Sequence, residues 1–219
     1  LVIGDLFKQK ADVVITTNTT FDTIFTRDFI SKKSLQGQFT LKYYKNIENL
    51  DRDIEYELSN YQPNKVLNRH NTKCKRYPIG TTIKLHHNDF KSYWLALCDV
   101  NEVGKPEDIS FNNNIQASLE ALWSYMTYNG NMDKLAIPII GSGRSGITTS
   151  RENILKEIIY SFVAYSQQKK ITEELVICIS PHDFATKKLR LDDLNKFLEY
   201  ACIYRYSKYQ ETSSSIGIS

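Results

Sequence analysis

Gly141-Ser142-Gly143-Arg144-Ser145-Gly146-Ile147 is the stretch that decides the fold. It follows an apolar run at residues 135–140, which has the length of a buried strand. It precedes an amphipathic pattern that begins near Thr149 or Ser150, where Thr149 and Glu152 have the spacing of a capping box. A strand, a glycine-rich turn and a helix in this order predict one unit of an α/β fold.

The glycines of this turn suit it to bind phosphate. Gly141, Gly143 and Gly146 allow positive φ and a close approach of the backbone to a ligand. Consecutive N–H groups beside a helix N-terminus form a cradle for phosphate oxygens, and Arg144 and the two serine hydroxyls add further donors. The alternative is an ordinary strand-to-helix turn, in which glycine occurs for geometry alone.

The same letters also fit G-x-G-x-x-G, the dinucleotide-binding fingerprint. That fingerprint expects an acidic residue about 20 positions further on. The next predicted strand covers residues 175–179, and the acidic residue that follows it is Asp183, which lies well beyond that spacing. The unit also comes late in the chain. The sequence therefore favours a phosphate loop over an NAD dehydrogenase site.

Composition indicates a globular protein of one domain. The chain has 219 residues, of which 41% are apolar and 24% are charged. A net charge of +3 is too small to argue for a nucleic-acid partner. Four cysteines without a C-x-x-C pair and four scattered histidines predict no metal site. The sequence shows no signal peptide or membrane span, and it begins at Leu1 inside an apparent strand, so we expect a chain cut from a longer protein.

Taken in order, the chain alternates strand and helix patterns, which predicts an α/β fold. We expect residues 24–60 to be mainly helical with an interruption around 34–38, and residues 65–76 to form a basic loop. One domain over residues 1–208 and a disordered tail over 209–219 are expected. The remaining expected strands lie at 1–3, 11–17, 81–86, 93–100, 135–140 and 175–179. The remaining expected helices lie at 112–128 and 189–206, and one more begins at about residue 150.

Three polar segments follow predicted strands, and such segments meet at one edge of an open α/β sheet. Asp5 follows the first strand, Asn18 and Asp22 follow the second, and the glycine turn follows the strand at 135–140. Asp5 could accept a hydrogen bond from an exocyclic amine. Asn18 and Asp22 could hold ribose hydroxyls, and the turn could hold a diphosphate. Together these groups suit a nucleotide.

At this point the motifs resemble those of macro domains. Gly4-Asp5-Leu6-Phe7, followed by residues 11–18, is similar to their opening, in which G-D-I precedes a strand that ends in V-N-A-A-N. Tyr77-Pro78-Ile79-Gly80-Thr81-Thr82 is similar to the P-x-G motif before their central strand, and residues 137–147 are similar to their diphosphate-binding loop. The resemblance covers about residues 1–185. It implies a three-layer α/β/α fold with a central mixed sheet.

Within that superfamily the chain most resembles the macro domain of the membrane-anchored effectors of type II Thoeris anti-phage defence. Residues 17–23, 30–39 and 76–82 carry this resemblance. It implies a non-catalytic sensor, without a cofactor, for an ADP-ribose-derived signal that a TIR enzyme makes, namely ADP-ribose joined to histidine. Binding would drive homo-oligomerisation and membrane damage. It also implies membrane-spanning helices upstream of a cytoplasmic domain in a bacterial membrane protein.

The resemblance also implies roles for single residues. Asp5 would contact adenine with Leu6 beside it, and the seven residues from Gly141 to Ile147 would wrap the diphosphate. The residues that would approach the distal ribose and its attached group are Asn18, Phe21 and Asp22. The residues that would stand where macro domains have their first glycine-rich loop are Gln36, Gly37 and Gln38.

The chain departs from the macro pattern at two places that bear on catalysis. One glycine replaces the glycine run of the first loop, and Thr-Thr-Asn at 16–18 replaces Ala-Ala-Asn. Small errors in positioning a water lower a rate far more than an affinity, so binding is expected rather than hydrolysis. Two alternatives stay open: an ADP-ribosyl hydrolase in which Asn18 and Asp22 position water, and an RNA binder that uses the basic run at 65–76.

Overall fold

A central sheet organises the computed structural model, which describes residues 1–26, 29–69, 72–107, 111–141, 149–186 and 189–214. In the described residues this sheet has six strands, in the order β1-β8-β7-β2-β6-β5. β5 runs antiparallel to β6 and the other neighbours are parallel, so the sheet is mixed, as predicted. The strands are β1 (Val2–Ile3), β2 (Asp12–Asn18), β5 (Thr82–His86), β6 (Lys91–Cys98), β7 (Leu135–Pro138) and β8 (Leu175–Ile179).

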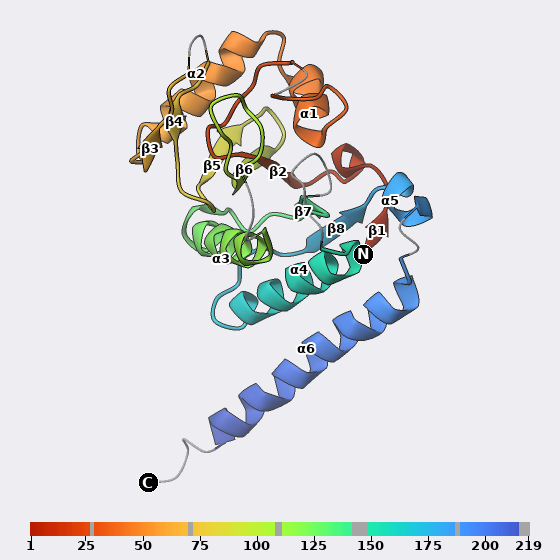
Figure 1. Cartoon of the computed structure of the whole chain (residues 1–219). Coiled ribbons are helices and arrows are strands. Elements are labelled where there is room, and N and C mark those ends of the chain that lie inside the picture. The colour runs from red at the N-terminus through yellow and green to blue at the C-terminus, as the bar shows by residue number, and fades with distance from the viewer. Residues whose placement is uncertain (27–28, 70–71, 108–110, 142–148, 187–188, 215–219) are drawn as a thin grey trace.

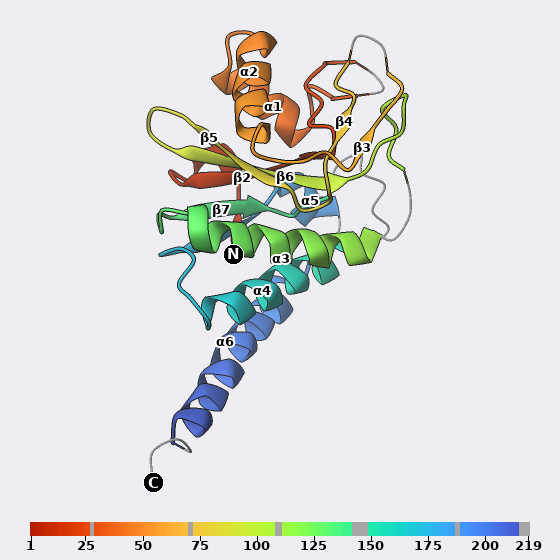
Figure 2. The same cartoon turned by 90° about the vertical axis from the view of Figure 1, so that its left-hand side faces the viewer.

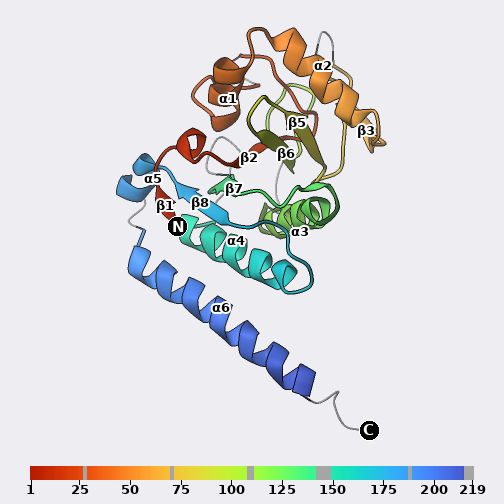
Figure 3. The same ribbon diagram turned by 180° about the vertical axis from the view of Figure 1, so that it is seen from behind.

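Helices cover both faces of the sheet (Figures 1 and 2). α1 (Leu35–Tyr43) and α2 (Ile47–Leu58) pack on one face. α3 (Phe111–Asn129) and α4 (Arg151–Ser166) pack on the other. α6 (Leu191–Ser214) packs against α4, and its C-terminal part extends away from the sheet (Figure 3). The three-layer α/β/α fold predicted from the sequence is confirmed.

β2 lies at the buried centre of this arrangement. Val13 and Ile15 pack with the side chains of α1 and α2, whereas Val14 packs with those of α3 and α4. All three side chains are at most 2% exposed. A strand that is covered on both faces reads as a continuous run of β-branched residues, which is what residues 13–17 show.

The start of α1 differs from the sequence prediction. Residues 34–38 were expected to interrupt a helix, but Ser34 is the N-cap of α1 and its Oγ accepts from the Gly37 N–H at 3.1 Å. Gly37 is used because a Cβ there would collide with the carbonyl oxygen of Ser31. The break between helices falls later, where the Asn46 side chain caps α2. Residues 24–26 and 29–34 are not helical.

Three further segments correct the sequence reading. The basic run at 65–76 holds a short antiparallel pair, β3 (Lys65–Val66) and β4 (Lys75–Arg76), and is not all loop. An unexpected helix, α5 (Pro181–Thr186), begins at a proline, which suits a first helical turn. The N-cap of α4 is Ser150, whose Oγ accepts from the Asn153 N–H, so the expected capping box does not form.

The C-terminal helix is longer than expected. α6 continues to Ser214, past residue 206 and through the first part of the tail predicted at 209–219. The rest of that tail lies outside the described residues. None of the described helices has both the length and the apolar character of a membrane span.

Candidate functional site

A cavity of about 520 Å³ opens at the edge of the sheet where β2, β7 and β8 end. This volume is typical of small-molecule sites. The carboxyl ends of parallel strands form the ligand crevice of open α/β sheets, so its place in the fold is the expected one. Its wall includes Thr17 and Asn18 from β2, Gln36 from α1, Lys105 from the loop after β6, and Gly141 after β7.

Thr17 brings an unused hydroxyl to this wall. The residue is 5% exposed, and its Oγ1 has no hydrogen-bond partner among the described residues. A buried polar group without a partner is uncommon in folded proteins, because its lost hydration is not replaced. A ligand that fills the cavity would satisfy this hydroxyl.

The Asn18 side chain organises the turn that follows β2. Its Oδ1 accepts from the N–H groups of Thr20 and Asp22 at 3.2 and 3.1 Å, and its Nδ2 donates to Asp22 Oδ2 at 2.9 Å. Phe21, inside this turn, has a φ of 53° and is fully buried. The turn is therefore rigid, and it presents Asn18 at the wall of the cavity while Phe21 packs in the core.

Asp22 forms a buried ion pair behind this turn. Arg69 Nη1 lies 3.1 Å from Asp22 Oδ2, and Arg69 also donates to the backbone carbonyls of Lys73 and Asn101. The guanidinium lies 5.4 Å from the centre of the Phe29 ring, which lines the cavity. Arg69 thus joins three loops around the site, although it does not itself line the cavity.

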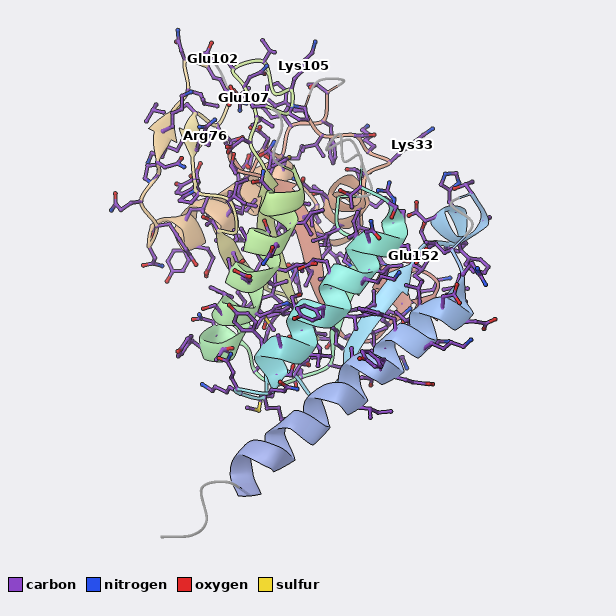
Figure 4. The ribbon with its side chains drawn as sticks, turned by 60° about the horizontal axis from the view of Figure 1, so that its bottom comes forward. Lys33, Arg76, Glu102, Lys105, Glu107 and Glu152 are labelled. Atoms are coloured by element: carbon purple, nitrogen blue, oxygen red, sulfur yellow. The ribbon has the colours of Figure 1, made fainter. Side chains whose placement is uncertain are left out.

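The N-terminus of α1 faces the same cavity. Ser34, Leu35 and Gln36 contribute to the wall, and the Gln36 amide donates to the Asp22 carbonyl oxygen at 2.7 Å. Lys33 precedes the helix and also lines the cavity. Figure 4 shows Lys33 and Lys105 projecting from different segments, one just ahead of α1 and the other in the loop after β6.

The opposite end of the cavity is formed after β8. Ser180 Oγ donates to Asp183 Oδ2 at 3.0 Å, and Arg151 Nε lies 3.5 Å from Asp183 Oδ1. Both Ser180 and Asp183 line the cavity. The neighbouring strand β1 leads to Asp5, whose Oδ1 accepts from the Phe7 N–H and caps the short 3₁₀ helix Leu6–Lys8.

The structure brings some of the predicted site residues together and leaves others behind the wall. Four of them line the cavity: Asn18, Gln36, Gln38 and Gly141, of which Gly141 has a φ of 70°. Five described residues do not line it: Asp5, Leu6, Phe21, Asp22 and Gly37. Six lie outside the described residues: Ser142, Gly143, Arg144, Ser145, Gly146 and Ile147.

Sequence reasoning missed several residues of the wall. Thr17 was noticed as a departure from Ala-Ala-Asn, but the hydroxyl itself was given no role. Lys33, Lys105 and Asp183 were not singled out for the site, because each belongs to a segment whose place depends on the folded chain. The Ser-Pro-x-Asp spacing at 180–183 is the one signal that could have located α5 and hence Asp183.

The two cysteines in the wall are poor nucleophiles. Burial raises the pKa of the Cys98 thiol to about 12, and burial raises that of Cys178 to about 11. Both thiols are therefore protonated at neutral pH. Over the described ranges, His, Cys, Asp and Glu side chains nowhere gather in threes as they would around a metal ion.

A second cavity of about 770 Å³ lies beyond the turn, between α2 and the β3–β4 pair. Three of its charged side chains are already paired, since Lys73 Nζ lies 2.7 Å from Asp51 Oδ1 and Asp22 bonds Arg69. Thr72 Oγ1 has no partner there, but Thr72 is only half-buried. The cavity at the ends of the parallel strands is the stronger candidate.

Comparison with known proteins agrees with this geometry. Among solved structures, the macro domain of ganglioside induced differentiation associated protein 2 matches at 11% identity with a TM-score of 0.54, covering 85% of this chain and 78% of its own. A mutant of the Oceanobacillus iheyensis macrodomain matches at 11% identity with a TM-score of 0.55, covering 94% and 88%. A third structure, the Oceanobacillus iheyensis macrodomain with MES bound, matches at 11% identity with a TM-score of 0.56, covering 94% of this chain and 90% of its own. These likenesses show the fold.

The family comparison is more specific. No curated protein matches the chain. The family model described as "Thoeris protein ThsA, Macro domain" matches residues 1–180, which is most of the chain. The chain therefore belongs to the family of Thoeris ThsA macro domains.

Proposed function

We propose that this chain is the ligand-sensing domain of an anti-phage defence effector and that it binds an ADP-ribose-derived signal nucleotide without turning it over. In this proposal the signal is ADP-ribose joined to histidine and is made by a TIR-domain enzyme. Binding drives homo-oligomerisation and then membrane disruption through a membrane-spanning segment upstream of Leu1. The domain would then lie on the cytoplasmic side of a bacterial membrane.

The observation that carries this proposal is the cavity of about 520 Å³ at the ends of β2, β7 and β8, in a chain of the ThsA macro family. The lining residues follow the order of the strands, from Ser180 and Asp183 after β8, through Gly141 after β7 and Asn18 in β2, to Lys105 after β6. An elongated nucleotide with a diphosphate at its middle suits such an arrangement.

The parts of the nucleotide are assigned along the order of the strands. The adenine lies toward β8 and β1, where Asp5 and Leu6 follow. The diphosphate lies at Gly141 and the glycine-rich sequence that follows it. The distal ribose lies toward β2, where Asn18 meets it directly. In this assignment Asp22 and Phe21 act by holding the Asn18 turn, and Gly37 acts by letting α1 approach Ser31.

The groups beside the distal ribose support the absence of turnover, because their hydrogen-bonding atoms are already in use. A hydrolase needs a free carboxylate or amide to orient the attacking water. Asp22 is already bonded by Arg69 and Asn18, and Asn18 Oδ1 already accepts from the N–H groups of Thr20 and Asp22. The single proton of the Thr20 hydroxyl is shared between these two acceptors. The cysteines in the wall are protonated. Incubation of the purified domain with ADP-ribosylated substrate tests this point, because measurable release of ADP-ribose would favour the hydrolase.

Calorimetry with ADP-ribose tests the binding itself. We expect the native domain to bind, and we expect Gly143→Asp to abolish binding while thermal unfolding stays the same. The added carboxylate would face the diphosphate at close range and would keep the backbone away from it. A native domain that does not bind ADP-ribose or its histidine conjugate contradicts the proposal. Unchanged affinity in the variant would contradict the diphosphate assignment.

A further inference from the structure

We propose that the end of this cavity between α1 and the loop after β6 is an anion subsite, which takes a carboxylate or phosphate that the ligand carries in addition to its diphosphate. This rests on the proposed function and names the chemical class of the ligand. The donors of the subsite are the side chains of Lys33, Lys105 and Thr17, together with the first N–H groups of α1.

The two lysines supply charge that the protein does not use elsewhere. Lys33 and Lys105 both line the cavity, and neither ammonium group has an ion pair or hydrogen bond within the described part of the chain. Their backbones are fixed, because Lys33 N–H donates to Ser31 Oγ at 3.2 Å and Lys105 N–H donates to Asn101 Oδ1 at 3.0 Å. Two anchored segments thus carry free cations on long flexible stems to one opening.

Two further kinds of donor face the same space. Thr17 Oγ1 is buried and unpartnered in the wall. In α1, the Ser34 hydroxyl accepts from the Gly37 N–H, which leaves the earlier N–H groups of Leu35 and Gln36 without an intrahelical acceptor. All these groups donate, so the ligand group that fits them is an acceptor, and the lysines and the helix terminus favour a negative one.

The neighbouring carboxylates do not cancel this charge. Glu107 pairs with Arg76 at 2.7 Å, and Asp99 bonds the Thr19 hydroxyl at 2.8 Å and lies 3.7 Å from Arg76. Figure 4 shows Glu102 in the loop of Lys105, and Glu102 does not line the cavity. The carboxylate that does line it, Asp183, stands at the opposite end beside Arg151.

The strand order separates this subsite from the diphosphate position. Gly141 follows β7, whereas Lys105 follows β6, and β2 lies between these two strands. Asp183 lies on the other side, after β8. If the diphosphate sits at the turn after β7 and adenine toward β8, the lysines reach the group attached to the distal ribose. We therefore infer that this attached group is anionic.

Calorimetry with four probes tests the subsite: ADP-ribose, its distal-ribose 1-phosphate, its histidine conjugate and the matching histidinamide conjugate. The histidinamide differs from histidine by loss of the carboxylate charge. We expect the phosphate and the histidine conjugate to bind the native domain about tenfold more tightly than ADP-ribose and the histidinamide conjugate, respectively, which lack that phosphate or carboxylate. A larger gain for the phosphate would identify a phosphate as the natural group, and a larger gain for histidine would identify a carboxylate.

The double variant Lys33→Gln with Lys105→Gln removes both charges and keeps side chains of similar length. We expect it to abolish the tenfold preference and to leave ADP-ribose affinity within about twofold. Lys32→Gln is the matched control, because Lys32 is exposed, is adjacent to Lys33 and does not line the cavity. This control should keep the preference.

Two results would overturn the inference while leaving the proposed function intact. One is equal binding, by the native domain, of the probes with and without the additional phosphate or carboxylate. The other is an equal loss of affinity for ADP-ribose and for the charged probes in the double variant, because the lysines would then serve the diphosphate. Failure of the native domain to bind all four probes would instead remove the proposed function.

Discussion

Arg69 and Asp22 form an ion pair of 3.1 Å in which both side chains are 1% exposed. The two residues lie 47 positions apart in the sequence. Asp22 belongs to the turn that presents Asn18 to the cavity, and Arg69 extends from this turn to the carbonyl oxygens of Lys73 and Asn101. The pair thus holds the binding turn in place from behind.

Replacing Arg69 with methionine should therefore destabilise the domain. The change leaves the Asp22 carboxylate buried without its counter-charge, and breaking one side of such a pair costs about 3–5 kcal/mol in free energy of unfolding. Urea unfolding followed by circular dichroism measures this loss. Adding Asp22→Asn to Arg69→Met should recover part of it, since the stranded charge is removed. A single variant as stable as the native domain would contradict the structural role of the pair.

Thr17→Val should change stability and affinity in opposite directions. Valine has nearly the shape of threonine and lacks the unpartnered hydroxyl, so the ligand-free domain should gain about 1 kcal/mol in free energy of unfolding. Affinity for the histidine conjugate should fall by about tenfold, because its carboxylate loses a buried hydrogen bond, whereas ADP-ribose affinity should stay within about twofold.

Ser118→Ala is the matched control for Thr17→Val. Ser118 is fully buried on α3, its Oγ also has no partner among the described residues, and it does not line the cavity. This control should gain stability without losing affinity. If Thr17→Val binds the histidine conjugate as tightly as the native domain, the hydroxyl does not contact the ligand.

Gly37→Ala should destabilise the domain, although alanine is the better helix former by about 1 kcal/mol. The added methyl would collide with the Ser31 carbonyl oxygen and push the 31–34 segment, which lines the cavity. We expect a net loss of about 1–3 kcal/mol in free energy of unfolding and weaker binding. Leu41→Ala in the same helix, where Leu41 is 57% exposed, should be close to neutral. A Gly37→Ala domain that is more stable than the native one would contradict the close packing.

His87 should make stability depend on pH. Burial lowers its pKa from 6.5 to about 4, against a smaller opposite effect of Asp53. The unfolded chain therefore takes up a proton at higher pH than the folded one, so the His87 contribution is complete above pH 6.5 and is lost as the pH falls toward 4.

The melting temperature between pH 7.5 and 4.5 measures this dependence. His87→Gln should flatten the decline, whereas His86→Gln, at an exposed position whose charge is the smallest cause of the lowered His87 pKa, should flatten it much less. A decline of the same slope in the His87→Gln variant would show that other groups are responsible.

The sequence predicted the elements whose patterns are local and missed those that depend on distant contacts. β8 begins and ends where its apolar run does, and β2 is central because its β-branched run is covered on both faces. The start of α1 was missed because Gly37 resembles a helix breaker until Ser31 is seen against it. The order of strands could not be derived from the sequence, since register and neighbours follow from packing.

The candidate site shows the same division. Asn18 and Gly141 could be assigned from motifs, and both line the cavity. The ion pair between Asp22 and Arg69 could not be predicted from the sequence, because a paired aspartate and an unpaired one look the same in a sequence. Lys33 and Lys105 come from two loops that the fold brings to the same cavity, so no spacing in the sequence could identify them.

A crystal structure of the domain with a non-hydrolysable ADP-ribose analogue tests the central claim most directly. The account predicts the diphosphate against Gly141, adenine toward Asp5 and the distal ribose beside Asn18. Nucleotide density in the cavity between α2 and the β3–β4 pair, or away from the Gly141 turn altogether, would contradict it.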